Sequence, residues 1–306
     1  MARRNSILVT TDLSAGSLAA LPVAVLLARS EQARVELLYV EDPPPIGADT
    51  PSDIEGFLKN RTQREREFQQ IVMRLKNEDT LEVVPHFKEG PVLETILSVI
   101  DAVQPGFVVM ATHGRSGISR LLLGSVTEQV LRLSPCPVLC VKQGQQAFGP
   151  GPILCCTDLS SHAAEAMPFA AALAHERKAP LHLVMVLEDQ LHMSSEGKPL
   201  AWMVEEHRRM ERHLHRTAAQ VKSRHALETT VRLRHGKPAA EICAETAEIN
   251  AAIIVMASHG RTGMRRLLMG SVTEEVVRRS ACPVLVVRSR VQDAVSASPS
   301  TQAMTV

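Results

Sequence analysis

Residues 109–141 read VMATHGRSGISRLLLGSVTEQVLRLSPCPVLCV, and residues 255–287 read VMASHGRTGMRRLLMGSVTEEVVRRSACPVLVV. The two segments are identical at 23 of 33 positions, whereas chance would give about two. The same offset of 146 residues carries the Thr-Asp-Leu-Ser sequence that begins at Thr11 to the one that begins at Thr157. A period of this length is that of a whole domain rather than of a solenoid unit. The sequence therefore predicts two copies of one domain, joined head to tail.

Short apolar segments alternate with longer segments of helical periodicity in each copy. In the first copy the expected strands cover residues 7–11, 35–40, 81–87, 107–111 and 138–141. The expected helices cover residues 17–30, 58–76, 92–103 and 126–133. Pro22 and Pro168 fall within helical patterns and are expected to mark kinks or late helix starts. The segment at 107–111 is apolar throughout, which is typical of a strand covered by helices on both faces. We therefore predict the α/β fold class, with two tandem doubly wound, mostly parallel, Rossmann-like sheets.

Composition sets the expected domain boundaries. We place the first domain at residues 1–143 and the second at residues 152–289. Between them, residues 144–151 are rich in Gln, Gly and Pro, which is typical of a linker. Residues 290–306 have little to bury and are expected to form a disordered tail.

The overall composition argues against several classes of protein. A formal net charge of +1 and an aromatic content of 3% provide neither the basic patch nor the stacking platforms that nucleic acids require. The longest uncharged segment, residues 13–28, is too short to span a membrane, and the apolar run at residues 7–9 is too short for a signal peptide. Six cysteines without a CxxC pair are expected to be reduced thiols. We therefore expect a cytoplasmic protein without a nucleic-acid partner, membrane contact or metal site.

Glycines follow the fourth expected strand in both copies. In the first copy nine residues separate Gly114 from Gly124-Ser125, and the second copy repeats this spacing with Gly260, Gly270 and Ser271. A glycine beyond a strand lets the backbone approach a bulky group, and a helix that begins at Gly-Ser offers unpaired amides to phosphate. A structural explanation competes with this one. Ser125 with Glu128, and Ser271 with Glu274, match the capping box, in which the serine merely caps the helix.

An aspartate directly follows the first strand of each copy, at Asp12 and Asp158. In an open parallel sheet, ligands bind beyond the carboxyl ends of the strands near the point where the strand order reverses. Asp12 and Gly114 belong to that edge. The sequence thus predicts a site of nucleotide size, with a carboxylate for the adenosine and amides for the phosphates.

The histidines do not favour catalysis or metal binding. His113 and His259 lie beside the loop glycines, but no nucleophile accompanies either, so we expect them to anchor the loop. A helical segment of the second copy carries four more, and their spacing does not place them on one face as a metal site requires. We expect these to belong to a solvated helix face: His207, His213, His215 and His225.

The sequence resembles the universal stress proteins in their tandem two-domain form, from residue 7 to about residue 287. ATP-binding members of that family carry Gly-x-x-Gly, nine residues, and then Gly-Ser or Gly-Thr. The second and third glycines are present here in both copies, whereas the first is replaced by Ala111 and by Ala257. The resemblance implies the adenine nucleotide α-hydrolase-like variety of the Rossmann-like fold and ATP as the ligand, with Mg²⁺ as the ion that usually accompanies triphosphates.

The resemblance also implies a set of nucleotide-binding residues. Asp12 and Asp158 would hold the adenosine part, with Thr11 and Thr157 beside them. Val40 and Val186 would meet the base, with Met110 and Met256 packing nearby; ordinary core packing is the alternative for these four. The amides or hydroxyls offered to the phosphates would come from Gly114, Gly124, Ser125, Val126, Gly260, Gly270, Ser271 and Val272. Arg115 and Arg261 follow the loop glycines and are second-tier phosphate partners, because arginine binds phosphate in a bidentate manner.

The last strand of each copy is expected to be an apolar edge strand, which would promote aggregation if it stayed unpaired. In the family this strand makes the dimer contact. We therefore expect the two copies to pair through their last strands as an intramolecular pseudo-dimer, with a homodimer as a further step.

Three functions follow from these observations. The first is an ATP-binding protein of stress response or signalling, with nucleotide-dependent contacts to an unknown protein partner. Hydrolysis would be slow or absent, since the sequence has neither a Walker lysine nor a carboxylate cluster for a metal. The second is a weak nucleotide hydrolase on the same scaffold. The third is a nucleotide-free structural or partner-binding module, which Ala111 and Ala257 favour.

Overall fold

The computed structural model of the chain describes residues 6–43, 50–113, 123–145, 148–188, 201–260 and 269–288. Its first half contains β1 (Ser6–Thr11), α1 (Ala15–Leu18), α2 (Leu21–Glu31), β2 (Arg34–Glu41), α3 (Pro51–Asn77), β3 (Val83–Glu89), α4 (Val92–Val103), β4 (Phe107–Ala111), α5 (Ser125–Leu133) and β5 (Val138–Val141). Its second half contains β6 (Ile153–Cys156), α6 (Ser161–Ala164), α7 (Met167–Arg177), β7 (Leu181–Leu187), α8 (Ala201–His225), β8 (Thr229–His235), α9 (Pro238–Glu248), β9 (Ile253–Ala257), α10 (Ser271–Arg279) and β10 (Val284–Val287). The order of elements is the same in both halves, as the internal repeat predicts.

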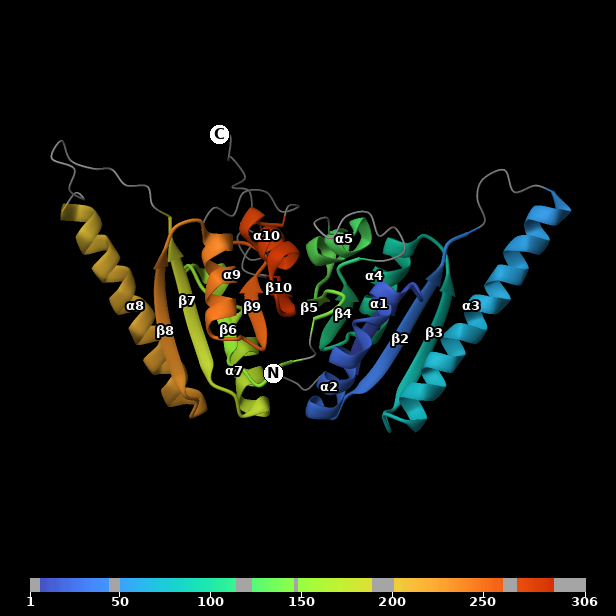
Figure 1. Ribbon diagram of the computed structural model, residues 1–306, viewed down its shortest axis with the longest axis horizontal. Helices are drawn as coiled ribbons and strands as arrows, with labels where there is room; N and C mark the ends of the chain where they lie inside the picture. Colours follow the sequence, from blue (N-terminus) through green and yellow to red (C-terminus); the bar gives the residue numbers. More distant parts are fainter. Residues whose placement is uncertain are drawn as a thin grey trace, which may run out of the picture.

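The strands of the described residues form one continuous sheet in the order β3-β2-β1-β4-β5-β10-β9-β6-β7-β8 (Figure 1). Neighbouring strands within each half are parallel. The strand order reverses beside the first strand of each half, so that β1 lies between β2 and β4, and β6 between β7 and β9. The predicted doubly wound α/β architecture is confirmed.

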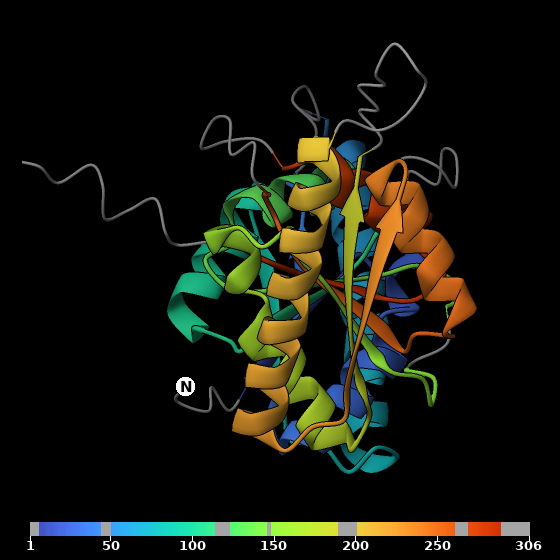
Figure 2. The same ribbon diagram turned by 90° about the vertical axis from the view of Figure 1, so that its left-hand side faces the viewer.

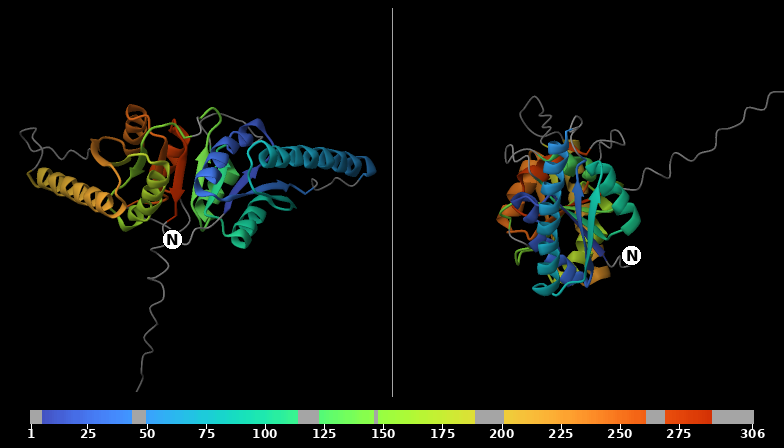
Figure 3. Two further views of the ribbon diagram at one scale, coloured as in Figure 1. Left: turned by 90° about the horizontal axis from the view of Figure 1, so that it is seen from below. Right: turned by 90° about the vertical axis from the view of Figure 1, so that its right-hand side faces the viewer.

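Helices cover both faces of the sheet, which explains why the central strands are apolar throughout (Figure 3). On one face, Leu27 of α2 and Phe68 of α3 belong to a core that continues into the second half. On the other face, Ile100 of α4 and Leu131 of α5 belong to a second core. The long helix α8 runs beside β7 and β8 at one end of the molecule (Figure 2), and α3 takes the equivalent place at the other end.

The prolines account for the main difference in helix boundaries. The helix expected at residues 17–30 is two helices, α1 and α2, and Pro22 is the second residue of α2. Pro168 holds the same place in α7. Proline has no amide hydrogen to donate and fits the first turn of a helix, so both residues mark late helix starts.

The expected linker packs closely where the structure describes it. The side chain of Gln145 donates to the carbonyls of Ser280 and Cys282, at 3.1 and 2.9 Å. Gly151 approaches the Asn250 carbonyl so closely that a Cβ there would lie only 1.8 Å from the oxygen. The expected tail at residues 290–306 lies outside the described residues.

The two halves join through β5 and β10, which pair antiparallel with Leu139 opposite Leu285. All four residues of each strand are buried. Around this contact, Lys142 Nζ donates to the Arg278 carbonyl at 3.0 Å, and Arg288 donates to the Leu133 carbonyl at the same distance. The predicted pairing of the last strands within one chain is confirmed.

We predict that Leu139→Asp and Leu285→Asp each lower the free energy of unfolding by about 3 kcal/mol, because each places an unpaired carboxylate in the interior. Chemical denaturation measures this loss, and light scattering should show self-association through the released strand edges. Leu26→Asp is the matched control, since Leu26 is 38% exposed on α2. Wild-type stability in either interface variant would contradict the role given to this contact.

Candidate functional site

A pocket of about 530 Å³ lies at the carboxyl ends of β6, β7 and β9, bounded by α8 on one side and by the starts of α9 and α10 on the other. Its volume is within the range of small-molecule sites. Every described residue that the sequence predicts for the second copy lines it, namely Thr157, Asp158, Val186, Met256, Ala257, Gly260, Gly270, Ser271 and Val272. The structure therefore brings these residues together, and their role as nucleotide ligands stays a prediction.

The aspartate stands on a strained turn. Leu159, the next residue, has a φ of 62°, a left-handed conformation that side chains other than glycine seldom adopt. Its amide donates to Thr157 Oγ1 at 3.0 Å, and the Ser160 amide donates to Asp158 Oδ1 at 3.0 Å. Gly260 lies against the other carboxylate oxygen, since a Cβ there would be 2.5 Å from Asp158 Oδ2. The turn thus fixes the carboxylate at the pocket, while the threonine hydroxyl is used to hold the turn.

The first half repeats this turn. Leu13 has a φ of 66°, and its amide donates to Thr11 Oγ1 at 3.0 Å. Asp12 Oδ1 accepts from both the amide and the hydroxyl of Ser14, at 2.9 and 2.6 Å. The same Thr-Asp-Leu-Ser sequence therefore forms the same turn in both halves, and hydrogen bonds to the threonine and aspartate side chains hold it.

The capping-box interpretation of the serines is wrong. The N-cap of α5 is Gly124 and that of α10 is Gly270, and neither helix has a side-chain cap. The two glycine amides, which were expected to face phosphate, instead donate to the carbonyls of Thr112 and Ser258 at 2.8 and 2.9 Å. A Cβ on either glycine would lie 3.1 Å from the same carbonyl oxygen. Glycine therefore suits this close approach of two backbone segments, because a Cβ would require the neighbouring backbone to shift by a few tenths of an ångström.

The amides available at these helix starts are the next three. In α10 these belong to Ser271, Val272 and Thr273, and helix geometry gives none of them an acceptor within the helix. The Thr273 hydroxyl donates to the Ala257 carbonyl at 3.0 Å, and Thr127 donates equivalently to Ala111 at 2.9 Å. These threonines tie the helix start to the strand end. Sequence reasoning missed them, although their recurrence at the offset of 146 residues was a usable signal.

Pocket lining and core packing coincide for several predicted residues. Met256 lines the pocket and is buried, and its first-half equivalent Met110 is buried in the same manner. Val186 and its equivalent Val40 are partly buried at the ends of their strands and pack against the core shared with α4 and α9. Ala111 and Ala257 belong to the other core, and Ala257 also lines the second-half pocket.

The histidines beside the loop take part in local hydrogen bonds. His113 Nδ1 lies 2.9 Å from Thr112 Oγ1, and His259 Nδ1 lies 3.0 Å from Ser258 Oγ. Both contacts fit the expected anchoring role. On α8, His213, His215 and His225 are exposed as expected. His207 differs, because it lines the pocket and its ring lies 5.3 Å from that of His235.

The thiol and metal chemistry of the pocket is limited. Burial raises the pKa of Cys156, which lines the pocket, well above its ordinary value, so the thiol stays protonated and is a poor nucleophile. No group of three His, Cys, Asp or Glu side chains within the described residues is arranged to hold a metal ion.

None of the helices in the described ranges of the chain is both long and apolar enough to cross a bilayer.

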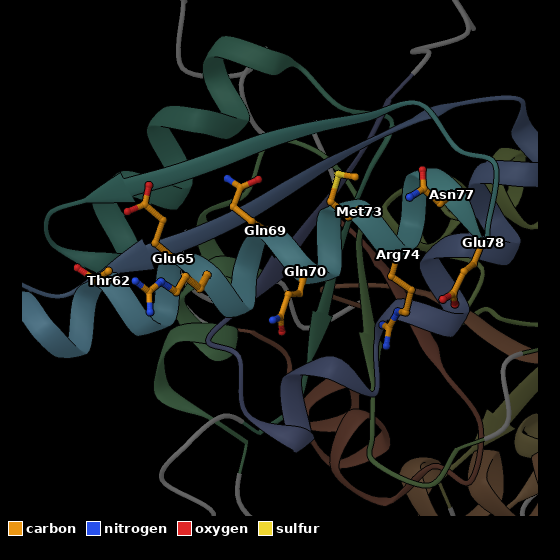
Figure 4. Close-up of a pocket in the computed structure, with 9 residues that line it drawn as sticks. Thr62, Glu65, Gln69, Gln70, Met73, Arg74, Asn77 and Glu78 are labelled. Atoms are coloured by element: carbon orange, nitrogen blue, oxygen red, sulfur yellow. The ribbon is translucent and has the colours of Figure 1, made fainter.

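A separate hollow of about 710 Å³ runs along α3 (Figure 4). Its lining, from Thr62 to Glu78, comes from one helix and the residue that follows it, and includes the exposed Met73. Binding sites usually combine polar groups that converge from several elements, and this surface has none of that convergence. We therefore do not regard it as a candidate site.

Part of the predicted site lies outside the described residues, namely Gly114, Arg115 and Arg261. The other first-copy residues occupy the same elements as their second-copy equivalents, at the ends of β1, β2 and β4 and the start of α5.

Comparisons with known proteins agree with this architecture. A model of the universal stress protein family matches residues 3–142 and again residues 151–288. A universal stress protein of Mycolicibacterium smegmatis is 27% identical over 291 residues, which cover 93% of this chain and 97% of that protein. The crystal structure of a universal stress protein from Archaeoglobus fulgidus has the same fold, with 24% identity, a TM-score of 0.68 and coverage of 93% of this chain and 96% of that chain.

A second Archaeoglobus fulgidus structure is that of a universal stress protein in complex with dAMP. It is 22% identical, with a TM-score of 0.34, and covers 45% of this chain and 97% of that chain. The family model matches both halves of the sequence, and the chain therefore belongs to the universal stress protein family, as a tandem of two copies.

Proposed function

We propose that this protein binds ATP at the carboxyl edge of its sheet and that the loaded and empty states differ in their contacts with a protein partner, in stress response or signalling. The observation that supports the proposal is the second-half pocket, where a fixed carboxylate and a helix N-terminus face one cavity. Asp158 would hold the adenosine part, and the amides of Ser271, Val272 and Thr273 would bind the phosphates.

The order of these groups suits a nucleotide. The carboxylate is held by the turn after β6, whereas the helix start follows β9, the strand beside β6 in the sheet. The remaining lining includes Val186, Met210 and Ile242, which are apolar and suit a base. A ligand with an apolar ring, a polar middle and an anionic end therefore matches the order of these groups across the pocket.

The proposal includes slow hydrolysis or none. Cys156 is protonated, and the His259 Nδ1 atom is engaged with Ser258. Mg²⁺ would arrive with the triphosphate as its counter-ion, since the described residues provide no cluster of ligands for the free ion.

We predict that the purified protein carries adenine nucleotide. The protein is precipitated with acid, and chromatography of the supernatant identifies and counts what is released. Stoichiometric ATP supports the proposal. ADP that accumulates on incubation would favour a hydrolase, and the absence of nucleotide after purification and after incubation with ATP would favour a nucleotide-free module.

We predict that Gly260→Val lowers the affinity of the second half for ATP at least tenfold, which is about 1.4 kcal/mol. The added side chain would displace the Asp158 carboxylate, because even a Cβ would lie 2.5 Å from it. Isothermal titration calorimetry on the full chain measures the change. Gly149→Val is the matched control, because a Cβ on Gly149 meets nothing within 4 Å. Substitutions at Gly124 or Gly270 would be less informative, since they disturb the helix start itself. Equal affinities in the Gly260→Val and control proteins would refute the assigned role of Asp158.

A further inference from the structure

The two halves differ in one wall of the candidate site, the wall formed by the long helix (α3 or α8) and the strand beside it (β2 or β7). On this wall the second half places three apolar side chains at the pocket, namely Met185, Leu187 and Met210. The equivalent positions in the first half, 146 residues earlier, are Tyr39, Glu41 and Arg64, which bring a phenol hydroxyl and two opposite charges. Such a consistent difference stands out between copies whose phosphate ends are almost the same.

The structure supports this equivalence of positions. In the first half Glu41 is in register with Glu89, and in the second half Leu187 is in register with His235. On the long helices, the buried residues are equivalent at the same offset of 146 residues: Phe68, Val72 and Leu75 in α3, and Leu214, Ala218 and Val221 in α8. The contact between the long helix and the outer strand also recurs with changed residues. It is an ion pair of Arg61 with Glu89 in one half and the ring contact of His207 with His235 in the other.

In the first half the wall contains a locked ion pair. Arg64 donates to both carboxylate oxygens of Glu41, with Nε 2.7 Å from Oε2. Tyr39 donates its hydroxyl to the same carboxylate at 2.9 Å. The Glu41 side chain is 4% exposed, and its hydrogen bonds raise the pKa of Arg64. The guanidinium fork is thus occupied by Glu41, and a ligand packed against this wall would have to remove the remaining water from both charges.

In the second half apolar side chains take the places of the ion pair, while Glu188 and Glu206 also line the pocket. Leu187 and two thioethers, Met185 and Met210, face the cavity. Methionine adapts its shape to a ligand and makes favourable contacts with aromatic rings. A planar heteroaromatic ring can therefore be buried here without desolvating an ion pair.

We propose that the two hollows are unequal, and that the second half is the high-affinity nucleotide site because its Met185, Leu187 and Met210 wall accepts the purine ring. The first half binds the same ligand at least tenfold more weakly, because the Glu41–Arg64 pair occupies the equivalent wall. This inference rests on the proposed function and adds to it the residues that set the affinity of each half.

The test exchanges the walls within the full chain. Leu187→Glu/Met210→Arg installs the ion pair in the second half, and Glu41→Leu/Arg64→Met installs the apolar wall in the first. Each exchange leaves the net charge unchanged, so the two variants are matched controls for each other. Calorimetric titration of nucleotide-stripped protein with MgATP measures affinity and stoichiometry, and thermal unfolding verifies that each variant is folded.

We expect the wild type to bind one ATP tightly and a second at least tenfold more weakly. Leu187→Glu/Met210→Arg should weaken the tight site at least tenfold, whereas Glu41→Leu/Arg64→Met should bring the stoichiometry of tight binding close to two. Two equal sites in the wild type, or a tight site that withstands the exchange in the second half, would overturn the inference while leaving the proposed function intact. No binding in any of the three proteins would overturn the proposed function itself.

A second measurement needs only the wild type. 8-Azido-ATP, added below one equivalent and activated by light, should label peptides of the second half in preference to those of the first. Equal labelling of the two halves would contradict the inference even if an exchange variant fails to fold.

Discussion

The antiparallel pairing of β5 with β10 is the contact on which the rest of the molecule depends. Each strand is the innermost of the five strands of its half, and without this pairing its backbone groups would be open to another chain. Leu139 against Leu285 places one residue of each copy at the centre of the joint. Because both strands belong to one chain, the contact forms at a high effective concentration that does not depend on the concentration of the protein.

Much of the fold could be predicted from the sequence, because the same order of apolar and helical segments occurs in both copies. The apolar strands such as β4, the late helix start at Pro22 and the grouping of the second-half site residues all follow from periodicity and the offset of 146 residues. The role of the serines at the helix starts could not be predicted. Gly124, and not Ser125, is the N-cap of α5. Its amide donates to the Thr112 carbonyl, and the position of that carbonyl is fixed only in the assembled sheet.

The residues that form the wall of the pocket could not be predicted from the sequence either. Glu41 and Arg64 are 23 residues apart, and their pairing follows only when α3 is set against β2 at a defined rotation. Even the equivalence of Arg64 with Met210 cannot be recognised from the neighbouring sequence, because the sequences of α3 and α8 agree in little beyond the positions of their buried residues. Helix–sheet packing, rather than propensity, decides which side chains reach the cavity.

The difference between the repeated helix start and the divergent wall of the pocket has a structural basis. The Asp158 turn directly follows β6, and a hydrogen bond from Thr273 to the Ala257 carbonyl ties the start of α10 to β9. Both strands lie in the interior of the sheet, so substitutions there disturb the core. The helix α8 packs at the end of the sheet, on β7 and β8, and many of its described side chains are exposed, so these can change with little effect on the strands. A duplicated domain can therefore change the lining of its pocket through the outer helix and the strand beside it, while the Asp158 turn and the start of α10 stay as the central strands fix them.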